Sequence, residues 1–161
     1  MSTPKIRVRG LRKAFGAKQV LDGVDLEVMP GQSLVVLGGS GSGKSVTLRC
    51  ILGLIEPDAG VIEIDGRDVL RMDGAERAAI LDRTAMLFQN GALFDSLPVW
   101  ENVCFKLLAQ GRIARGAARD RAAEILAQVG LAASVGDLRP AELSGGMQKR
   151  VSLARTIAST M

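Results

Sequence analysis

The chain has 161 residues, 47% of them apolar and 24% charged, which is enough for one globular domain but scarcely for two. It contains no histidine, and this excludes a Ser-His-Asp triad, an imidazole metal site and a histidine proton shuttle. Aromatic residues make up only 3%, with one tryptophan and no tyrosine, which argues against an RNA-binding surface built on base stacking.

The sequence predicts a soluble intracellular protein. The N-terminus has no apolar core of a signal peptide, and no apolar run approaches the ~18 residues of a membrane span. Cys50 and Cys104 are far apart and belong to no zinc or CxxC pattern, so we expect two reduced thiols.

The net charge of +4 comes from 21 basic and 17 acidic residues, most of them interspersed. One basic stretch stands out, and it contains Arg112, Arg115, Arg119 and Arg121. Such a stretch can contact nucleic acid or an anionic membrane surface, but it is more often a solvated helix face. We therefore expect no nucleic-acid partner.

Three strands are predicted before residue 38. The Ile-Arg-Val-Arg-Gly stretch that begins at Ile6 alternates apolar and polar residues, as does the stretch 24–28 that precedes a Pro-Gly break. These two predict a small antiparallel layer. Leu34–Leu37 is continuously apolar, which is typical of a strand buried on both faces.

Further along the chain, the sequence predicts alternating helices and strands and then a helical region. Apolar residues at helical spacing follow the glycine-rich loop as far as Pro57, and apolar runs at 61–64 and 85–88 predict two more strands. From about residue 95 to 140 the chain is rich in Ala and Arg with helical spacing, and a last helix is predicted from Gly145. This order favours an α/β body that carries a helical insertion.

The segment Gly38-x4-Gly43-Lys44-Ser45 matches the P-loop pattern. Its glycines allow successive backbone N–H groups to turn toward one anion, Lys44 supplies a charge for the β- and γ-phosphates, and Ser45 offers a hydroxyl to Mg²⁺. The alternative is a flexible Gly/Ser turn that matches by chance, while the G-x-G-x-x-G pattern of dinucleotide-binding folds is absent. The residues predicted to contact the nucleotide are Gly38, Gly39, Ser40, Gly41, Ser42, Gly43, Lys44, Ser45 and Val46.

A second motif is Leu143-Ser144-Gly145-Gly146-Met147. Ser144 is a good N-cap, and the two glycines expose backbone donors at a helix start, which makes a second anion site. By itself this motif favours an ordinary capped helix. Downstream of a P-loop, however, Leu-Ser-Gly-Gly resembles the signature motif of the ATPase domains of ABC transporters.

The resemblance covers nearly the whole chain and implies a P-loop NTPase fold of the ABC ATPase type. It assigns residues 1–94 and 145–161 to a RecA-like body with an N-terminal β layer, and residues 95–144 to a helical subdomain. Phe15 lies where the family keeps an aromatic ring that stacks on adenine, although it is also compatible with a core position. Gln89 resembles the Q-loop glutamine, which in the family reaches Mg²⁺ and the attacking water. The implied cofactors are ATP and Mg²⁺, with Ser45 and Gln89 at the metal.

The resemblance also implies partners. Two copies would sandwich ATP between the P-loop of one and residues 143–147 of the other. The stretches 90–94 and 99–103 resemble the segment that docks on the membrane subunit, so we expect a permease to bind near residues 89–103 and the protein to lie on the cytoplasmic face of the membrane. The sequence Gly-Ala-Leu-Phe at 91–94 and the methionine at 147 resemble those of the Mla or toluene-tolerance subfamily, which transports phospholipids in bacterial envelopes.

Two positions depart from the family pattern. Val46 replaces the usual Thr, which removes one hydroxyl from the phosphate site. The chain also ends at Met161, before the apolar strand whose Asp-Glu pair forms Walker B. The resemblance therefore implies that the catalytic glutamate lies beyond Met161, that the C-terminal part of the sheet is missing, and that this polypeptide alone does not hydrolyse ATP.

The function expected is that of a transporter subunit that binds ATP and couples its hydrolysis to transport. A truncated, non-hydrolytic nucleotide-binding or decoy module is the main alternative. A soluble P-loop kinase is disfavoured because it would leave the Leu-Ser-Gly-Gly segment unexplained.

Overall fold

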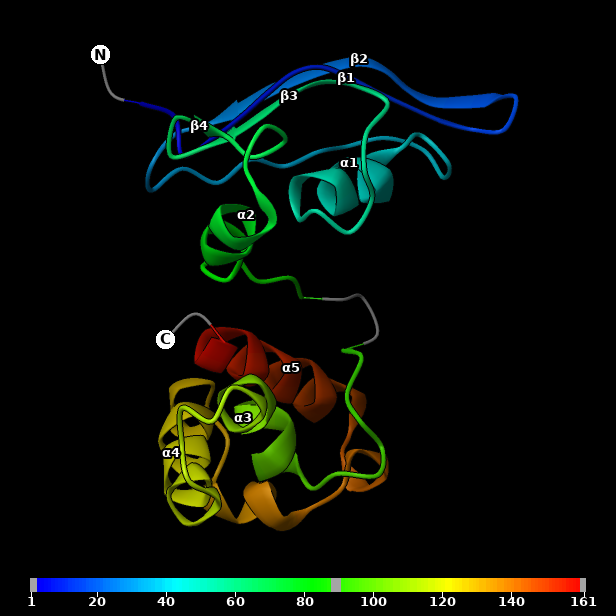
Figure 1. The fold of residues 1–161 in the computed structure, drawn as a ribbon. Helices are drawn as coiled ribbons and strands as arrows, with labels where there is room; N and C mark the ends of the chain where they lie inside the picture. Colours follow the sequence, from blue (N-terminus) through cyan, green and yellow to red (C-terminus); the bar gives the residue numbers. More distant parts are fainter. Residues whose placement is uncertain (1–2, 88–90, 160–161) are drawn as a thin grey trace. The chain divides into compact units, whose positions relative to one another are not determined.

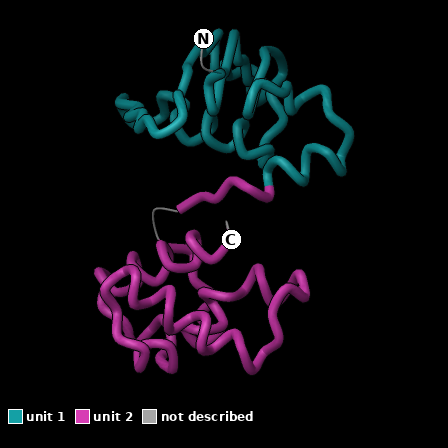
Figure 2. Tube along the Cα trace, turned by 90° about the vertical axis from the view of Figure 1, so that its left-hand side faces the viewer, with its two compact units in different colours: residues 1–81 teal, residues 82–161 magenta. Residues whose placement is uncertain are grey.

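The computed structural model describes residues 3–87 and 91–159 (Figure 1). The chain forms two compact units, residues 1–81 and 82–161 (Figure 2). Each unit has its own apolar core.

The first unit is an antiparallel sheet with helices on one side. Strands β1 (Ile6–Phe15), β2 (Lys18–Val28), β3 (Ala59–Ile64) and β4 (Arg67–Asp68) lie in the order β2-β1-β3-β4. All three strand pairs are antiparallel, which confirms the predicted β layer and extends it to the strand at 61–64. The unit also contains α1 (Lys44–Ile51) and α2 (Gly74–Leu81).

The core of this unit joins the sheet to α1. Val8, Leu11 and Leu21 from β1 and β2 are buried together with Cys50 and Ile51 from α1. Strand β3 approaches β1 so closely that a Cβ at Gly60 would lie 2.7 Å from the Cα of Leu11, and Gly60 has a φ of 111°. Only glycine is compatible with that contact and that backbone conformation.

Helix α1 ends earlier than predicted, at Ile51 and not at Pro57. Gly53 has a φ of 68°, its N–H donates to the Cys50 carbonyl, and the N–H of Leu54 donates to the Arg49 carbonyl. These two bonds form a Schellman motif, which satisfies the last carbonyls of the helix before Pro57 is reached.

Two predicted buried strands are wrong. Leu34–Leu37 forms no strand, with Val35 76% and Leu37 87% exposed, and residues 85–87 likewise form no strand. Phe88, the last residue of the second predicted strand, lies outside the described residues. The physical reason is that a strand needs a hydrogen-bonded neighbour, and no described segment pairs with either run.

The second unit is helical. It contains α3 (Val99–Ala109), α4 (Arg115–Gln128), α5 (Gly145–Ser159) and two short 3₁₀ turns, Ala133–Asp137 and Pro140–Glu142. Helix α3 packs against both α4 and α5, and small buried residues on α4 and α5 keep the helices close. These small residues are Ala118, Ala122, Ala154 and Ala158.

The predicted helical region and the last helix are confirmed. Gly130 has a φ of 70° and ends α4 in a second Schellman motif, in which Leu131 donates to the Leu126 carbonyl. Because α5 packs on α3 and α4, it belongs to the same compact unit as these helices. The boundary between the units therefore differs from the predicted one, which groups residues 145–161 with residues 1–94. The assignment of 145–161 to a RecA-like body stays a prediction.

The basic stretch at 112–121 is neutralised within this unit. Arg112 pairs with Asp82, Arg115 with Glu101, Arg119 with Asp137 and Arg121 with Glu124. Arg115 also lies over the Trp100 ring, 5.1 Å from its centroid. Every arginine of the stretch thus has a carboxylate partner, as expected for a solvated helix face.

One buried amide organises the chain before α3. Asn102 is 0% exposed, and its Oδ1 accepts a hydrogen bond from the Phe94 N–H at 2.7 Å. Its Nδ2 lies 3.0 Å from the Phe94 and Leu97 carbonyls and 3.3 Å from that of Pro98. A single side chain therefore satisfies the backbone of the loop at 94–98, in the segment predicted to dock on a membrane subunit.

We predict that Asn102→Leu lowers the free energy of unfolding of the second unit by about 2 to 4 kcal/mol, because the loop's backbone groups lose their buried partners. Urea unfolding followed by the fluorescence of Trp100, the single tryptophan, measures this unit directly. Gln110→Leu also replaces an amide by an apolar group, but at the exposed C-cap of α3, where the amide makes one exposed hydrogen bond to Asp82, and it should cost less than about 1 kcal/mol. Equal losses in the two variants would contradict the role assigned to Asn102.

Candidate functional site

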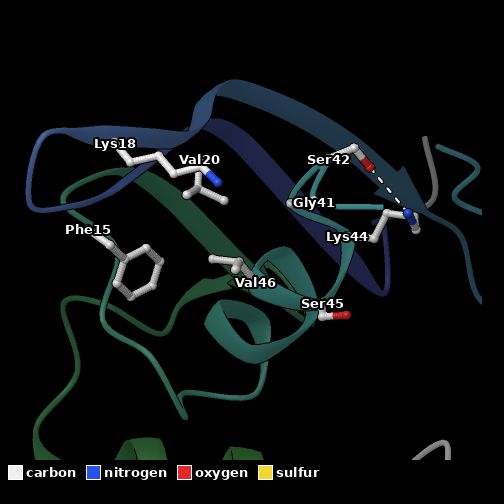
Figure 3. Close-up of a pocket in the computed structure, with 9 residues that line it drawn as sticks. Phe15, Lys18, Val20, Gly41, Ser42, Lys44, Ser45 and Val46 are labelled. Atoms are coloured by element: carbon white, nitrogen blue, oxygen red, sulfur yellow. Dashed lines mark hydrogen bonds between the residues drawn. The ribbon is translucent and has the colours of Figure 1, made fainter. Parts of the chain in front are cut away.

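A pocket of about 340 Å³ lies in the first unit, between the β1–β2 hairpin and the start of α1. It is lined by Phe15, Lys18 and Val20 from the hairpin and by residues 41–46 from the glycine-rich loop and α1 (Figure 3). Two predicted features that are far apart in the sequence, the P-loop and Phe15, therefore share one pocket.

The start of α1 is open to an anion. Gly43 is the N-cap residue, with a φ of 90°, and no side chain caps the first turn. The N–H groups of that turn consequently have no side-chain acceptor and lie at the positive end of the helix dipole. This is the arrangement that binds phosphate groups at helix N-termini.

The Lys44 ammonium lies on the loop. Its Nζ donates to the carbonyl oxygens of Gly38 and Gly39, both at 2.7 Å, and to the Ser42 hydroxyl at 3.2 Å. These are exposed hydrogen bonds with no carboxylate among the partners, so the positive charge is not neutralised.

The hydroxyls that follow Lys44 have different positions. Ser45 lines the pocket, and its contact with a metal ion stays a prediction. Val46 lines it as well, and its side chain also packs against the apolar core. Thr47 is buried and its Oγ1 donates to the Gly43 carbonyl at 3.1 Å, so it does not replace the hydroxyl that Val46 lacks.

Phe15 ends β1 and is 49% exposed, so the alternative of a plain core residue is not what the structure shows. Gly16, with a φ of 59°, begins the two-residue turn to β2. Asp58 accepts hydrogen bonds from the Ala14 N–H at 2.6 Å and from Lys13 Nζ at 2.7 Å, which fixes the chain just before the ring. The hydrogen bond from Lys13, and then that from Ala14, hold the pKa of Asp58 below its usual value.

The second motif lies in the other unit, at the start of α5. Ser144 acts as the predicted N-cap, since its Oγ accepts from the Met147 N–H at 3.3 Å. Leu143 is buried in the core of the unit, whereas Gly145 and Gly146 are exposed and nothing lies within 4 Å of a Cβ built on either. The backbone of these two glycines is therefore accessible to another molecule.

Gln89 lies outside the described residues. The chain that follows it is bound to α5. Arg155 donates to the carbonyls of Gly91 at 2.9 Å and Ala92 at 2.7 Å, and the Ser152 hydroxyl donates to the Gly91 carbonyl at 2.9 Å. Burial lowers the pKa of the Arg155 guanidinium from its usual value.

Sequence reasoning missed several of these residues. Lys18 and Val20 give no motif signal, and their place in the pocket follows only from the register of the hairpin. Arg155 and Ser152 lie one turn apart on α5, but their partners are backbone carbonyls about 60 residues earlier, which no sequence pattern indicates.

Both cysteines are buried and unpaired. Burial raises the pKa of each thiol, so they have low reactivity as nucleophiles.

Comparison with known proteins agrees with this geometry. The probable ribonucleotide transport ATP-binding protein mkl of Mycobacterium leprae is 40% identical over 154 residues, which are 94% of this chain and 44% of that protein. The lipoprotein-releasing system ATP-binding protein LolD of Novosphingobium aromaticivorans is 42% identical over 165 residues, or 99% of this chain and 72% of that protein. The chain thus spans less than half the length of the mkl protein.

A solved structure matches as well. The dimeric ATP-binding cassette MJ0796, in a post-hydrolysis state bound to ADP and Pi, has a TM-score of 0.82 and 30% identity over 96% of this chain and 69% of that chain. The fold and the loop define a P-loop NTPase of the ABC ATPase type. A sequence profile described as ABC transporter matches residues 21–161, and the chain belongs to that family.

We predict that Gly43→Ala lowers the free energy of unfolding of the first unit by about 1 to 3 kcal/mol. The new Cβ would lie 2.6 Å from Leu21 Cδ2 and 3.0 Å from the Val20 carbonyl oxygen, at a φ of 90°. Hydrogen exchange of the β1 and β2 amides measures the effect.

Gly39→Ala is the matched control in the same loop. Nothing lies within 4 Å of a Cβ there, and the residue has no positive φ, so we expect a change within about 0.5 kcal/mol. If both substitutions are equally well tolerated, the close packing of Gly43 on β2 is not a constraint on this loop.

Proposed function

We propose that the chain is the ATP-binding part of an ABC transporter ATPase. The single observation that carries this proposal is that an exposed aromatic ring and an uncapped P-loop helix line the same pocket. An aromatic ring stacks well on a nucleobase, whereas the loop and the helix start suit phosphates. A nucleotide with its base on Phe15 and its terminal phosphates at residues 41–45 would match both the aromatic end and the phosphate-binding end of the pocket.

The chemistry of the phosphate end is electrostatic. Backbone N–H groups of the loop and of the first turn of α1 would hold the phosphate oxygens, and Lys44 would move its ammonium from the loop carbonyls to the β- and γ-phosphates. The two loop carbonyls are neutral acceptors, so a phosphate oxygen is the stronger partner for the ammonium.

Mg²⁺ fits this pocket as an ion carried by the nucleotide. Ser45 supplies one hydroxyl, and Mg²⁺ bound to phosphates commonly uses only one or two protein ligands. By resemblance Gln89 would supply the second. Among the described residues no cluster of three acidic or cysteine side chains could hold a metal ion without the phosphates. When bound, the ion would neutralise charge that develops on the phosphates.

We propose hydrolysis as the activity of the whole protein and only binding for residues 1–161. The described residues that line the pocket include no carboxylate, and a lysine ammonium or a serine hydroxyl is a poor general base at neutral pH. Phosphate release by the 161-residue polypeptide should therefore equal that of its Lys44→Ala variant. Turnover that depends on Lys44 would show that the polypeptide contains a complete catalytic site.

A second copy of the chain is the proposed partner of the signature motif. The exposed backbone of Gly145 and Gly146 supports an interaction with a nucleotide held by another molecule, and the cassette MJ0796, with which this chain shares its fold, is dimeric. In this proposal residues 143–147 of one copy cover the P-loop pocket of the other.

A membrane permease is the proposed partner of residues 89–103. Phe94 and Phe105 are both about two-fifths exposed and stack with their ring centroids 4.4 Å apart. They line a groove of about 440 Å³ beside Arg155 and Lys106. An exposed aromatic pair beside cationic groups is typical of a protein-binding surface. No described helix is long and apolar enough to cross a membrane, so attachment through a permease at the cytoplasmic face is the arrangement we propose.

The cargo we propose is a phospholipid or another organic solute of the bacterial envelope. The Gly-Ala-Leu-Phe stretch at 91–94 and Met147 support the lipid-transporting subfamily. The names of the relatives point to different cargoes, ribonucleotides for mkl and lipoproteins for LolD, and therefore do not select one.

We predict that Lys44→Ala abolishes measurable binding of a fluorescent ATP analogue, because the mobile cation for the β- and γ-phosphates is lost. Lys5→Ala is the control, since Lys5 is an exposed lysine of the same unit that pairs with Asp65 outside the pocket. Titrations of the wild type and both variants measure the dissociation constants. Unchanged affinity in Lys44→Ala would overturn the proposed site.

We predict that Gly146→Gln prevents ATP-driven dimerisation but leaves the fold and monomeric ATP binding intact, since a Cβ at this position meets nothing within 4 Å. Gly116→Gln is a closely matched control, because Gly116 is likewise the second residue of a helix, exposed and open. Light scattering of the whole protein with ATP and Mg²⁺, in a hydrolysis-deficient background, reports the dimer. Dimers that persist in Gly146→Gln and Gly116→Gln alike would exclude the role of the signature glycines.

A further inference from the structure

We infer that Lys18 is a second phosphate-binding cation of the pocket and that it contacts the α-phosphate of the nucleotide. The inference rests on the proposed function, because it assigns one more residue to the same site.

The hairpin register places Lys18 beside Phe15. The strands β1 and β2 are joined by a two-residue turn, so Phe15 and Lys18 are directly paired across the ladder. Residues paired in this way project from the same face of an antiparallel sheet. Val20 lies two residues further along β2, at a shift in the register between the two strands. All three line the pocket.

The ammonium of Lys18 has no described counter-charge. No ion pair joins Lys18 to any residue in the described ranges 3–87 and 91–159, although most lysines and arginines of this unit are paired. The lining of the pocket contains two lysines, Lys18 and Lys44, and no acidic residue. The pocket is thus complementary in charge to a polyanionic ligand.

The two lysines approach the pocket from different elements. Figure 3 draws the Lys18 side chain along β2, over Val20, with its ammonium directed from the hairpin tip toward the loop. Lys44 is bound instead to the far part of the loop, at Gly38, Gly39 and Ser42. Phe15 and Val46 form the apolar end of the pocket, on the hairpin side of the loop.

This arrangement selects the part of the nucleotide that Lys18 meets. A nucleotide whose base lies on Phe15 and whose β- and γ-phosphates lie in the loop must pass Lys18 with its ribose and α-phosphate. Of these two groups the α-phosphate carries the negative charge, and a lysine ammonium binds phosphate as a point charge. Lys18 would then help to bind ATP and ADP equally, without sensing the γ-phosphate.

The test is calorimetric titration of the protein with ATP, ADP and adenosine. We expect Lys18→Gln to lower the affinities for ATP and ADP by the same factor, about five- to tenfold, since a single charge-assisted contact is lost at an exposed site. The affinity for adenosine should stay unchanged. The affinity of Lys18→Gln for ATP should also depend less steeply on the NaCl concentration. Lys18→Arg, which keeps the charge, should retain most of the affinity.

Lys5→Gln makes the same change outside the pocket and controls for net charge. ATP affinity that is unchanged in Lys18→Gln, or lowered equally in Lys5→Gln, would overturn the inference while Lys44→Ala still reports on the site itself. If Lys18→Gln lowered the affinity for adenosine as much as the affinity for ADP, the inference would also be overturned. Lys18 would then act on the part of the pocket that binds the base and not on the α-phosphate. Failure of the wild type to bind any of the three ligands would instead refute the proposed function, and this inference with it.

Discussion

Gly43 of the glycine-rich loop lies so close to strand β2 that a Cβ at this position would be 2.6 Å from Leu21 Cδ2 and 3.0 Å from the Val20 carbonyl oxygen. This approach has two consequences. It seats the start of α1 against the sheet, so that Cys50 and Ile51 reach the core, and it leaves the first turn of α1 without a cap. Gly43 thus contributes both to the packing of the unit and to its anion-binding property. The missing Cβ permits the contact with β2, and the left-handed backbone leaves the N–H groups at the start of α1 accessible.

The helix starts of α1 and α5, which both carry glycine, differ in that respect. The start of α1 follows a glycine and has no side-chain acceptor, whereas α5 follows Ser144, whose hydroxyl accepts from the Met147 N–H. A serine cap leaves part of the first turn satisfied in the free protein, and the exposed Gly145 and Gly146 backbone supplies the remaining contacts. The first turn of α1 therefore has fewer of its N–H groups bound to a side-chain acceptor than the first turn of α5.

Sequence reasoning succeeded where the determining interactions are local. The alternation in β1 and β2, the stop at Gly130 and the N-cap at Ser144 each depend on residues within a few positions, and each is confirmed. It failed at Leu34–Leu37, where an apolar run predicts a buried strand only if another strand pairs with it, and no described segment does. Lys18 was missed for a related reason, since its place in the pocket depends on cross-strand register and not on any motif.

Helix α5 joins two segments that the chain order keeps apart. Its exposed start carries Gly145, and about 15 Å further along the rod Arg155 holds the carbonyls of Gly91 and Ala92 with its guanidinium. Ser152 adds a third bond to the same backbone, and Arg155 lies 5.7 Å from the Phe94 ring centroid. Because Ser152 and Arg155 belong to the same continuous helix as Gly145, any displacement of α5 as a rigid body would also move the backbone at Gly91 and Ala92.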